Sequence, residues 1–132
     1  MVDTVTTRVL RSDSTGYTIR LLNHSDGSGE SAVKKVDRST LTGPSHVEPY
    51  GLDVVSIRWA VEGFSYVLVL WDAATDDECA ICINNGYENY SDVGGDRDPR
   101  STTNVGDILV TTSGAISGAA YDITLRLRLR GN

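Results

Sequence analysis

The sequence predicts an all-β protein: an antiparallel β-sandwich of about eight strands, in which a jelly-roll strand order is left open. Several segments alternate apolar and polar residues with a period of two, whereas the helical period is almost absent. The 132 residues include 13 glycines but only three prolines and one methionine, a composition typical of turn-rich and strand-rich chains. With 39% hydrophobic residues, the length indicates a single domain over 1–132 that can bury a core without metals or disulfides.

The first three strands are short, and recognisable turns separate them. Their alternating and β-branched residues predict strands at 4–10, 17–22 and 32–36. The intervening segments 13–16 and 23–29 are rich in residues that hydrogen-bond their own backbone or accept a positive φ. We therefore expect a turn at each of these segments.

The next two strands, 53–62 and 65–71, form the most clearly predicted hairpin, with Gly63 in the tight connection. Strand 65–71 is apolar on both faces, as expected for a central strand covered on both sides. In strand 53–62 alternate residues are apolar and should face the core: Val55, Ile57, Trp59 and Val61.

Weaker strand signals at 79–83 and 107–112 precede a strong one at 121–130. Every second residue of the last strand is apolar, which predicts one buried face: Tyr121, Ile123, Leu125, Leu127 and Leu129. The residues between them predict an outward polar face: Thr124, Arg126, Arg128 and Arg130.

The two cysteines, Cys79 and Cys82, lie within one predicted strand. Three residues of extended chain put their Cα atoms about 10 Å apart with the side chains on opposite faces, so no disulfide is expected. A zinc site would need two further ligands, but His24 and His46 are isolated in the sequence. We therefore expect two reduced, structural thiols.

Segment 84–105 is the long irregular region of the sequence, and a loop of this length in a small domain is usually functional or held by a partner. Calcium would suit oxygen ligands here, but 92–98 lacks EF-hand spacing and a closing Glu, so we predict no metal. The segment supplies five candidate contact residues: Tyr87, Tyr90, Asp92, Asp96 and Asp98.

Catalysis has no support in the sequence, which lacks a G-x-S-x-G nucleophile motif and a phosphate-binding loop. We therefore predict neither an enzyme nor a cofactor. The net charge of −6 opposes nucleic-acid binding. No apolar run has the length of a membrane span, and the N-terminal residues do not have the pattern of a secretory signal.

The last predicted strand carries three like charges spaced two residues apart: Arg126, Arg128 and Arg130. They could keep a sheet surface from aggregating, or they could contact an acidic patch on a neighbouring molecule or on another copy of the chain. The sequence leaves both interpretations open. Acidic residues are concentrated over 72–98, so opposite charges lie on separate elements, which favours assembly.

Several phrases of this sequence resemble small virion proteins of tailed bacteriophages, in particular the head decoration, or cement, proteins. The resemblance lies in segments 35–43, 57–59, 63–64, 70–72, 106–112 and 121–125. It implies a β-rich protein without enzymatic activity, made in the host cytoplasm and bound to the exterior of the capsid. The implied partner is the major capsid protein, and the implied assembly is a homo-oligomer, with a trimer favoured.

Two functions follow as expectations. The first is a structural virion protein that binds the outer capsid of a tailed phage and stabilises the head. The alternative is a carbohydrate- or receptor-binding β-sandwich module of a phage tail or surface structure, for which tyrosines such as Tyr87 and Tyr90 could form a platform.

Overall fold

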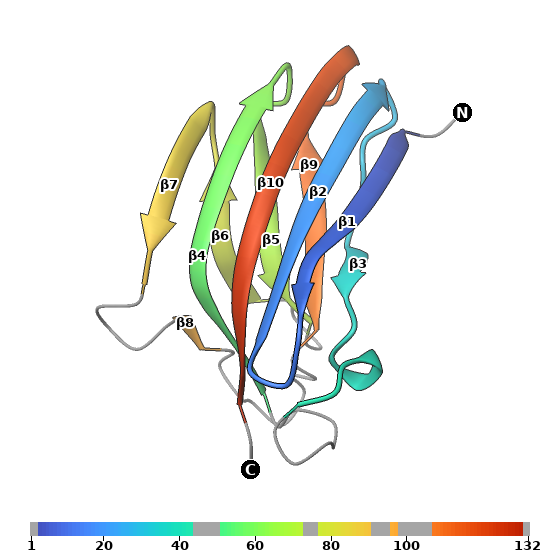
Figure 1. The fold of residues 1–132 in the computed structure, drawn as a ribbon. Helices are drawn as coiled ribbons and strands as arrows, with labels where there is room; N and C mark the ends of the chain where they lie inside the picture. Colours follow the sequence, from blue (N-terminus) through green and yellow to red (C-terminus); the bar gives the residue numbers. More distant parts are fainter. Residues whose placement is uncertain (1–2, 44–50, 73–76, 91–95, 98–106, 131–132) are drawn as a thin grey trace.

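The computed structural model describes residues 3–43, 51–72, 77–90, 96–97 and 107–130, and of 77–78, 96–97 and 130 it describes the backbone only. These residues form two facing antiparallel β-sheets (Figure 1). A short 3₁₀ helix, η1 (Arg38–Thr40), follows the third strand. The strands are β1 (Thr4–Ser12), β2 (Gly16–Asp26), β3 (Val33–Val36), β4 (Gly51–Glu62), β5 (Tyr66–Trp71), β6 (Asp77–Cys82), β7 (Asn85–Asn89), β8 (Asp96–Arg97), β9 (Ile108–Ser113) and β10 (Ser117–Arg130).

The strand order is that of a jelly roll. The larger sheet runs β1-β2-β10-β4-β7 with β8 also paired to β4, and the smaller sheet runs β3-β9-β5-β6. Apart from β1 and β8, the strands pair first with last along the chain: β2 with β10, β3 with β9, β4 with β7 and β5 with β6. A long antiparallel ribbon folded over on itself produces this order. The sequence prediction of an antiparallel sandwich is therefore confirmed, and the open question of strand order is answered.

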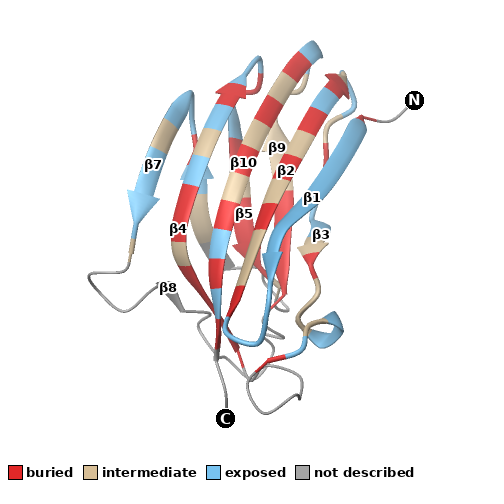
Figure 2. Ribbon diagram, viewed as in Figure 1, coloured by how far each residue is buried: buried red, intermediate tan, exposed pale blue. Residues whose placement is uncertain are grey.

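The core lies between the sheets and follows from the alternation of β10. The five predicted inward residues of β10 are all buried, whereas Arg126 and Arg128 are exposed (Figure 2). Across from them, the smaller sheet contributes fully buried residues such as Val67, Val69 and Trp71. On the other face of β5, Leu70 is buried and Leu68 is half-buried, so β5 is the central strand that its composition predicted.

The predicted hairpin of 53–62 with 65–71 is wrong, because β4 and β5 belong to different sheets. Gly63, at φ +85°, and the buried Phe64 carry the chain across the core from one sheet to the other. A residue with a Cβ atom is disfavoured at this φ, and a Cβ atom at Gly63 would also come within 3 Å of Ala119. The apolar faces of β4 and β5 therefore meet across the sandwich and not within one sheet.

Val55 does not face the core as the alternation predicted. The register shifts between Arg126, which lies opposite Ser56, and Leu127, which lies opposite Val54, so Val55 is the extra residue of a β-bulge. The bulge turns Leu52 and Val54 inward, and both are fully buried. It also places Asp53 on the outer face of the sheet.

Segment 84–105 is not irregular throughout, because 85–89 and 96–97 are strands that both pair with β4.

Strand β6 also contains a bulge, because Ala80 and Glu78 lie opposite successive residues of β5 and Cys79 is the extra residue. This bulge changes the prediction for the cysteines. Cys79 packs against the same core that contains Cys82, so the two side chains do not point to opposite faces. Neither cysteine forms a disulfide.

Candidate functional site

The outer face of the larger sheet contains two adjoining hollows, which we call the outer-face groove. Their volumes are about 730 and 740 Å³, and both are lined by Ala60, Asn85 and Asp122. The strand registers place Leu22, Asp122, Ala60 and Asn85 side by side on β2, β10, β4 and β7. Because Ala60 is small, it leaves space on the sheet surface where the longer residues beside it rise. The groove therefore crosses the strands and does not run along them.

The floor of the first hollow is mostly apolar and its rim is polar. Leu22 and Ala60 lie on either side of Asp122, and Ala120 lies two residues before Asp122 on β10. His24 and Glu62 lie on either side of Ala120 on the neighbouring strands. Asn85 lies next to Ala60 on β7 and also lines the hollow. A largely apolar hollow with a few polar groups at its rim is the usual form of a small-molecule site.

The second hollow is bounded by Tyr87, whose side chain is 52% exposed on the edge strand β7. The guanidinium carbon of Arg58, opposite Tyr87 on β4, lies 5.2 Å from the centre of the tyrosine ring, within the range of a cation–π contact. Gly86 allows β7 to pass directly over the indole of Trp59, because a Cβ atom at Gly86 would overlap that ring. The indole Nε1 donates to the carbonyl oxygen of Ile83 at 3.0 Å. These contacts hold the tyrosine ring at the edge of the groove.

Arg20 and Asp122 form a two-pronged ion pair between the hollows. Arg20 Nε donates to Oδ1 of Asp122 at 3.0 Å and Arg20 Nη2 donates to Oδ2 at 2.6 Å. The pair raises the pKa of Arg20 through the hydrogen bond and the charge of Asp122. Among the described lining residues, the positive charges of Arg20 and Arg58 balance the negative charges of Glu62 and Asp122.

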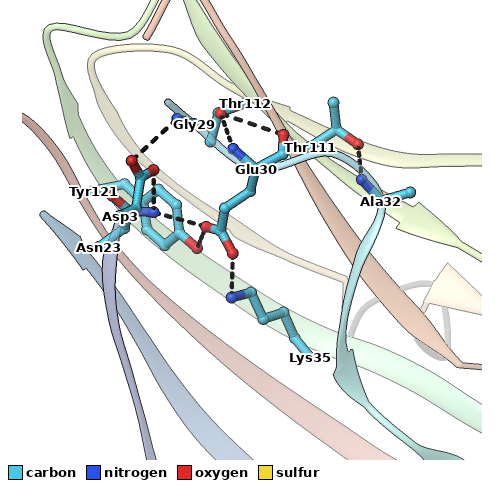
Figure 3. A network of polar contacts seen from close by, with 9 residues as sticks. All are labelled: Asp3, Asn23, Gly29, Glu30, Ala32, Lys35, Thr111, Thr112 and Tyr121. Carbon is cyan, nitrogen blue, oxygen red and sulfur yellow. Dashed lines mark hydrogen bonds and ion pairs between the residues drawn. The ribbon is translucent and has the colours of Figure 1, made fainter. Parts of the chain in front are cut away.

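A buried polar network closes the sandwich where β2 turns toward β3 (Figure 3). Its centre is the carboxylate of Glu30, which is ion-paired with Lys35, both side chains being less than 5% exposed. Tyr121 Oη donates to Glu30 Oε1 at 2.5 Å, and Asn23 Nδ2 donates to the same oxygen at 2.8 Å. Burial, followed by the hydrogen bond to Glu30, raises the pKa of Tyr121. The network joins both sheets and pairs the buried charges of Glu30 and Lys35, although Asn23 Oδ1 has no hydrogen-bond partner among the described residues. We therefore assign the network a structural role.

Asp3 extends this network to the N-terminal segment. Its carboxylate accepts hydrogen bonds from Asn23 Nδ2 at 3.0 Å, Ser25 Oγ at 2.9 Å and the backbone N–H of Gly29 at 3.0 Å. Burial by itself would raise the pKa of Asp3, but these bonds together with one from the backbone of Asp26 hold it below its ordinary value. The start of β1 is thereby fixed to the turn after β2.

Strand β1 is an edge strand, and all nine of its residues are exposed (Figure 2). Val5, Thr7 and Val9 lie opposite Asn23, Leu21 and Ile19, which are all buried. These three residues of β1 therefore lie on the core-facing side of the sheet, yet Val5 is 38% and Val9 is 51% exposed. We call Val5, Thr7 and Val9 the β1 overhang. The sequence predicted strand 4–10 but gave no sign that its inner face would be uncovered.

The three candidate arginines have different environments. Arg128 is ion-paired with the fully buried Asp53 through Nε at 3.1 Å and Nη2 at 2.5 Å, so its charge compensates that buried carboxylate. Arg126 is exposed beside Ser56 and Thr18, and the structure records no ion pair for it among the described residues. Arg130 pairs with Gly51 through its backbone, and its side chain lies outside the described part of the chain.

The candidate contact residues from 84–105 also lie in different environments. Tyr87 lines the groove, whereas Tyr90 packs against the core and its N–H donates to the carbonyl oxygen of Val55 at 2.7 Å. Asp96 pairs with Val54 through the backbone of β8. Asp92 and Asp98 lie outside the described residues.

Sequence reasoning missed the groove residues Asn85 and Asp122, because only the strand register brings them together.

Within the described residues, no group of three or more histidine, cysteine, aspartate or glutamate side chains is placed to hold a metal ion. In the part of the chain that the structure describes, no helix is long and apolar enough to cross a membrane. Comparison with protein-family models gave no match to this chain, and a search of curated proteins also found no relative.

Proposed function

We propose that this chain is a non-enzymatic structural virion protein that binds the outer capsid of a tailed phage and stabilises the head. The observation that carries the proposal is the β1 overhang. An exposed edge strand with apolar residues on its core-facing side is a surface that monomeric proteins normally shorten or cover with charge. Here Val5 and Val9 are uncovered, and the strand is nine residues long.

The rest of the fold suits such a role. The proposed partner of the overhang is the major capsid protein, which would cover Val5 and Val9 and extend the sheet at its free edge. The polar network fixes the start of β1 through Asp3, so the strand would be presented in one orientation. Self-association, with a trimer favoured, belongs to the same proposal and accords with the resemblance to decoration proteins.

Binding of the purified protein to phage heads tests the proposal. We expect the double variant Val5→Lys with Val9→Lys to weaken binding by at least about tenfold, because both substitutions put charge into an apolar contact. Thr4→Lys with Thr6→Lys is the matched control, since these residues lie on the other side of the same strand, in the register of the exposed His24 and the half-buried Leu22. Failure of the unaltered protein to bind heads, or equal binding by the two variants, would overturn the proposal.

Arg126 tests whether charge contributes to the assembly. If an acidic surface of a neighbouring molecule faces it, Arg126→Glu should weaken assembly and make the remaining binding less sensitive to salt. Arg128→Glu is unsuitable for this test, because it would also replace the ion pair between Arg128 and the buried carboxylate of Asp53 with two like charges. Unchanged assembly of Arg126→Glu would show that this arginine keeps the sheet surface soluble and makes no contact.

A further inference from the structure

We infer that the outer-face groove is a binding site for a neutral oligosaccharide. The inference does not rest on the proposed function, because the groove and the β1 overhang lie on opposite faces of the larger sheet. It rests on the exposed aromatic ring, the fixed polar groups and the charge balance of the groove.

Tyr87 supplies the surface on which a sugar ring can stack. Its ring is half exposed at the edge of the second hollow, and the Arg58 guanidinium 5.2 Å from the ring centre restrains it. A tyrosine that only filled the core would be covered, as Tyr121 is at 3% exposure. An aromatic ring held in place before the ligand arrives loses little conformational entropy on binding, and it offers an apolar face to the C–H side of a sugar.

The polar groups of the groove suit hydroxyl groups. Asp122 is held by both prongs of Arg20, so its carboxylate has a fixed direction and can accept further hydrogen bonds. Asn85 offers both a donor and an acceptor within the same hollows, and Glu62 adds two acceptor oxygens at the rim of the first. A chain of hydroxyl groups that both donate and accept can satisfy such a set.

The charge balance argues against anionic ligands. Among the residues that the structure describes, two arginines and two carboxylates line the groove, and Arg20 is already neutralised by Asp122. Phosphate groups and nucleic acid would meet Glu62 and Asp122 without a surplus of positive charge. A neutral ligand pays no such penalty.

A peptide strand is also a poor occupant. The three central strands that form the floor, β2, β10 and β4, are hydrogen-bonded to neighbours on both sides, so they have no free backbone edge for another strand. The groove runs across these strands, and a ligand must therefore be held by side chains. Each hollow is in the size range of small-molecule sites, so a ligand that occupies both has several sugar units.

Titration with neutral gluco-, galacto- and manno-oligosaccharides tests the inference. The indole of Trp59 packs beneath β7, the strand that carries Tyr87, so its fluorescence should respond when a ligand binds over β7. We expect Tyr87→Ala to weaken binding by about tenfold or more. Ala60→Gln fills the floor that the two hollows share and should abolish binding with little effect on stability, since Ala60 is exposed. Tyr66→Ala is the matched control, because Tyr66 is also an exposed tyrosine but belongs to the smaller sheet.

A saturable fluorescence change that both groove variants lose and the control keeps would establish the site. The inference would be overturned if none of these oligosaccharides bound at millimolar concentration. It would also be overturned if the folded Tyr87→Ala and Ala60→Gln proteins bound as well as the unaltered chain, or if the groove bound peptides and no sugar. Thermal melting of each variant confirms that it is folded before binding is compared.

Discussion

Removal of the Lys35 ammonium group should destabilise this protein far more than loss of an ordinary surface charge. Lys35 is the cation paired with Glu30, and the two side chains are 3% and 4% exposed. In Lys35→Met the alkyl chain is largely retained, so the main change is that Glu30 stays buried without its counter-charge. Tyr121 and Asn23 can still donate to Glu30, but neither carries a charge.

Breaking a buried ion pair by removing one partner costs about 3–5 kcal/mol, because an uncompensated charge stays out of water. A domain of this size has a free energy of unfolding of about 5–15 kcal/mol, so the variant should lose a large part of its stability. For a chain of this length the loss corresponds to a fall in the midpoint of thermal unfolding of roughly 10–20 °C. In Glu30→Gln with Lys35→Met both charges are gone, and we expect this double variant to recover at least about 2 kcal/mol.

Urea unfolding followed by fluorescence measures these differences. Arg11→Met is the control: Arg11 pairs with Asp13 at 2.7 Å, and both side chains are 47% exposed. Water can replace either partner of this exposed pair, so the control should change stability much less. Equal effects of Arg11→Met and Lys35→Met, or a double variant no more stable than Lys35→Met, would refute the account of the network.

Three further predictions concern single residues. Hydrogen bonds lower the pKa of Asp3 in the folded state, so its contribution to stability is present above about pH 4 and is lost as the pH falls through the folded-state pKa. Asp3→Asn should therefore flatten the acid side of a curve of stability against pH. An unchanged acid side would contradict this prediction. Burial raises the pKa of the Cys82 thiol to about 12, so a thiol reagent should modify Cys82 only after unfolding, as mass spectrometry of the labelled peptides can show; fast labelling in the folded protein would be the contrary result. Gly86→Ala should destabilise the protein by about 1–3 kcal/mol and alter the emission of Trp59, because the new methyl group displaces the indole or β7. Urea unfolding and fluorescence spectra measure these effects. Results that match those of the unaltered chain would count against the described packing.

The strands that the sequence predicted well are those with strong contrast between two faces. In β10 the apolar and polar residues alternate without a break over the predicted segment, and burial follows that alternation. Strand β7 has no such contrast, because it is an exposed edge strand whose pairing is decided by β4. Its sequence, Asn85–Asn89, therefore resembles a loop.

The errors of register and connection have a different origin. Alternation shows which side of a strand is buried, but it does not show whether the next strand lies in the same sheet. The predicted hairpin of β4 with β5 is wrong for this reason. A bulge such as that at Val55 adds one residue and reverses the pattern beyond it. The groove was not predictable, since Leu22, Ala60 and Asp122 become neighbours only through the order β2-β10-β4.

We propose that this chain binds the outside of a phage head through the β1 overhang. The most direct test is an image reconstruction of heads incubated with the purified protein, beside heads incubated with the Val5→Lys and Val9→Lys variant. We predict added density on the outer capsid surface, with β1 against the major capsid protein, for the unaltered chain and none for the variant. Heads without added density in both samples, or density that contacts the capsid through another surface while β1 faces solvent, would contradict the account.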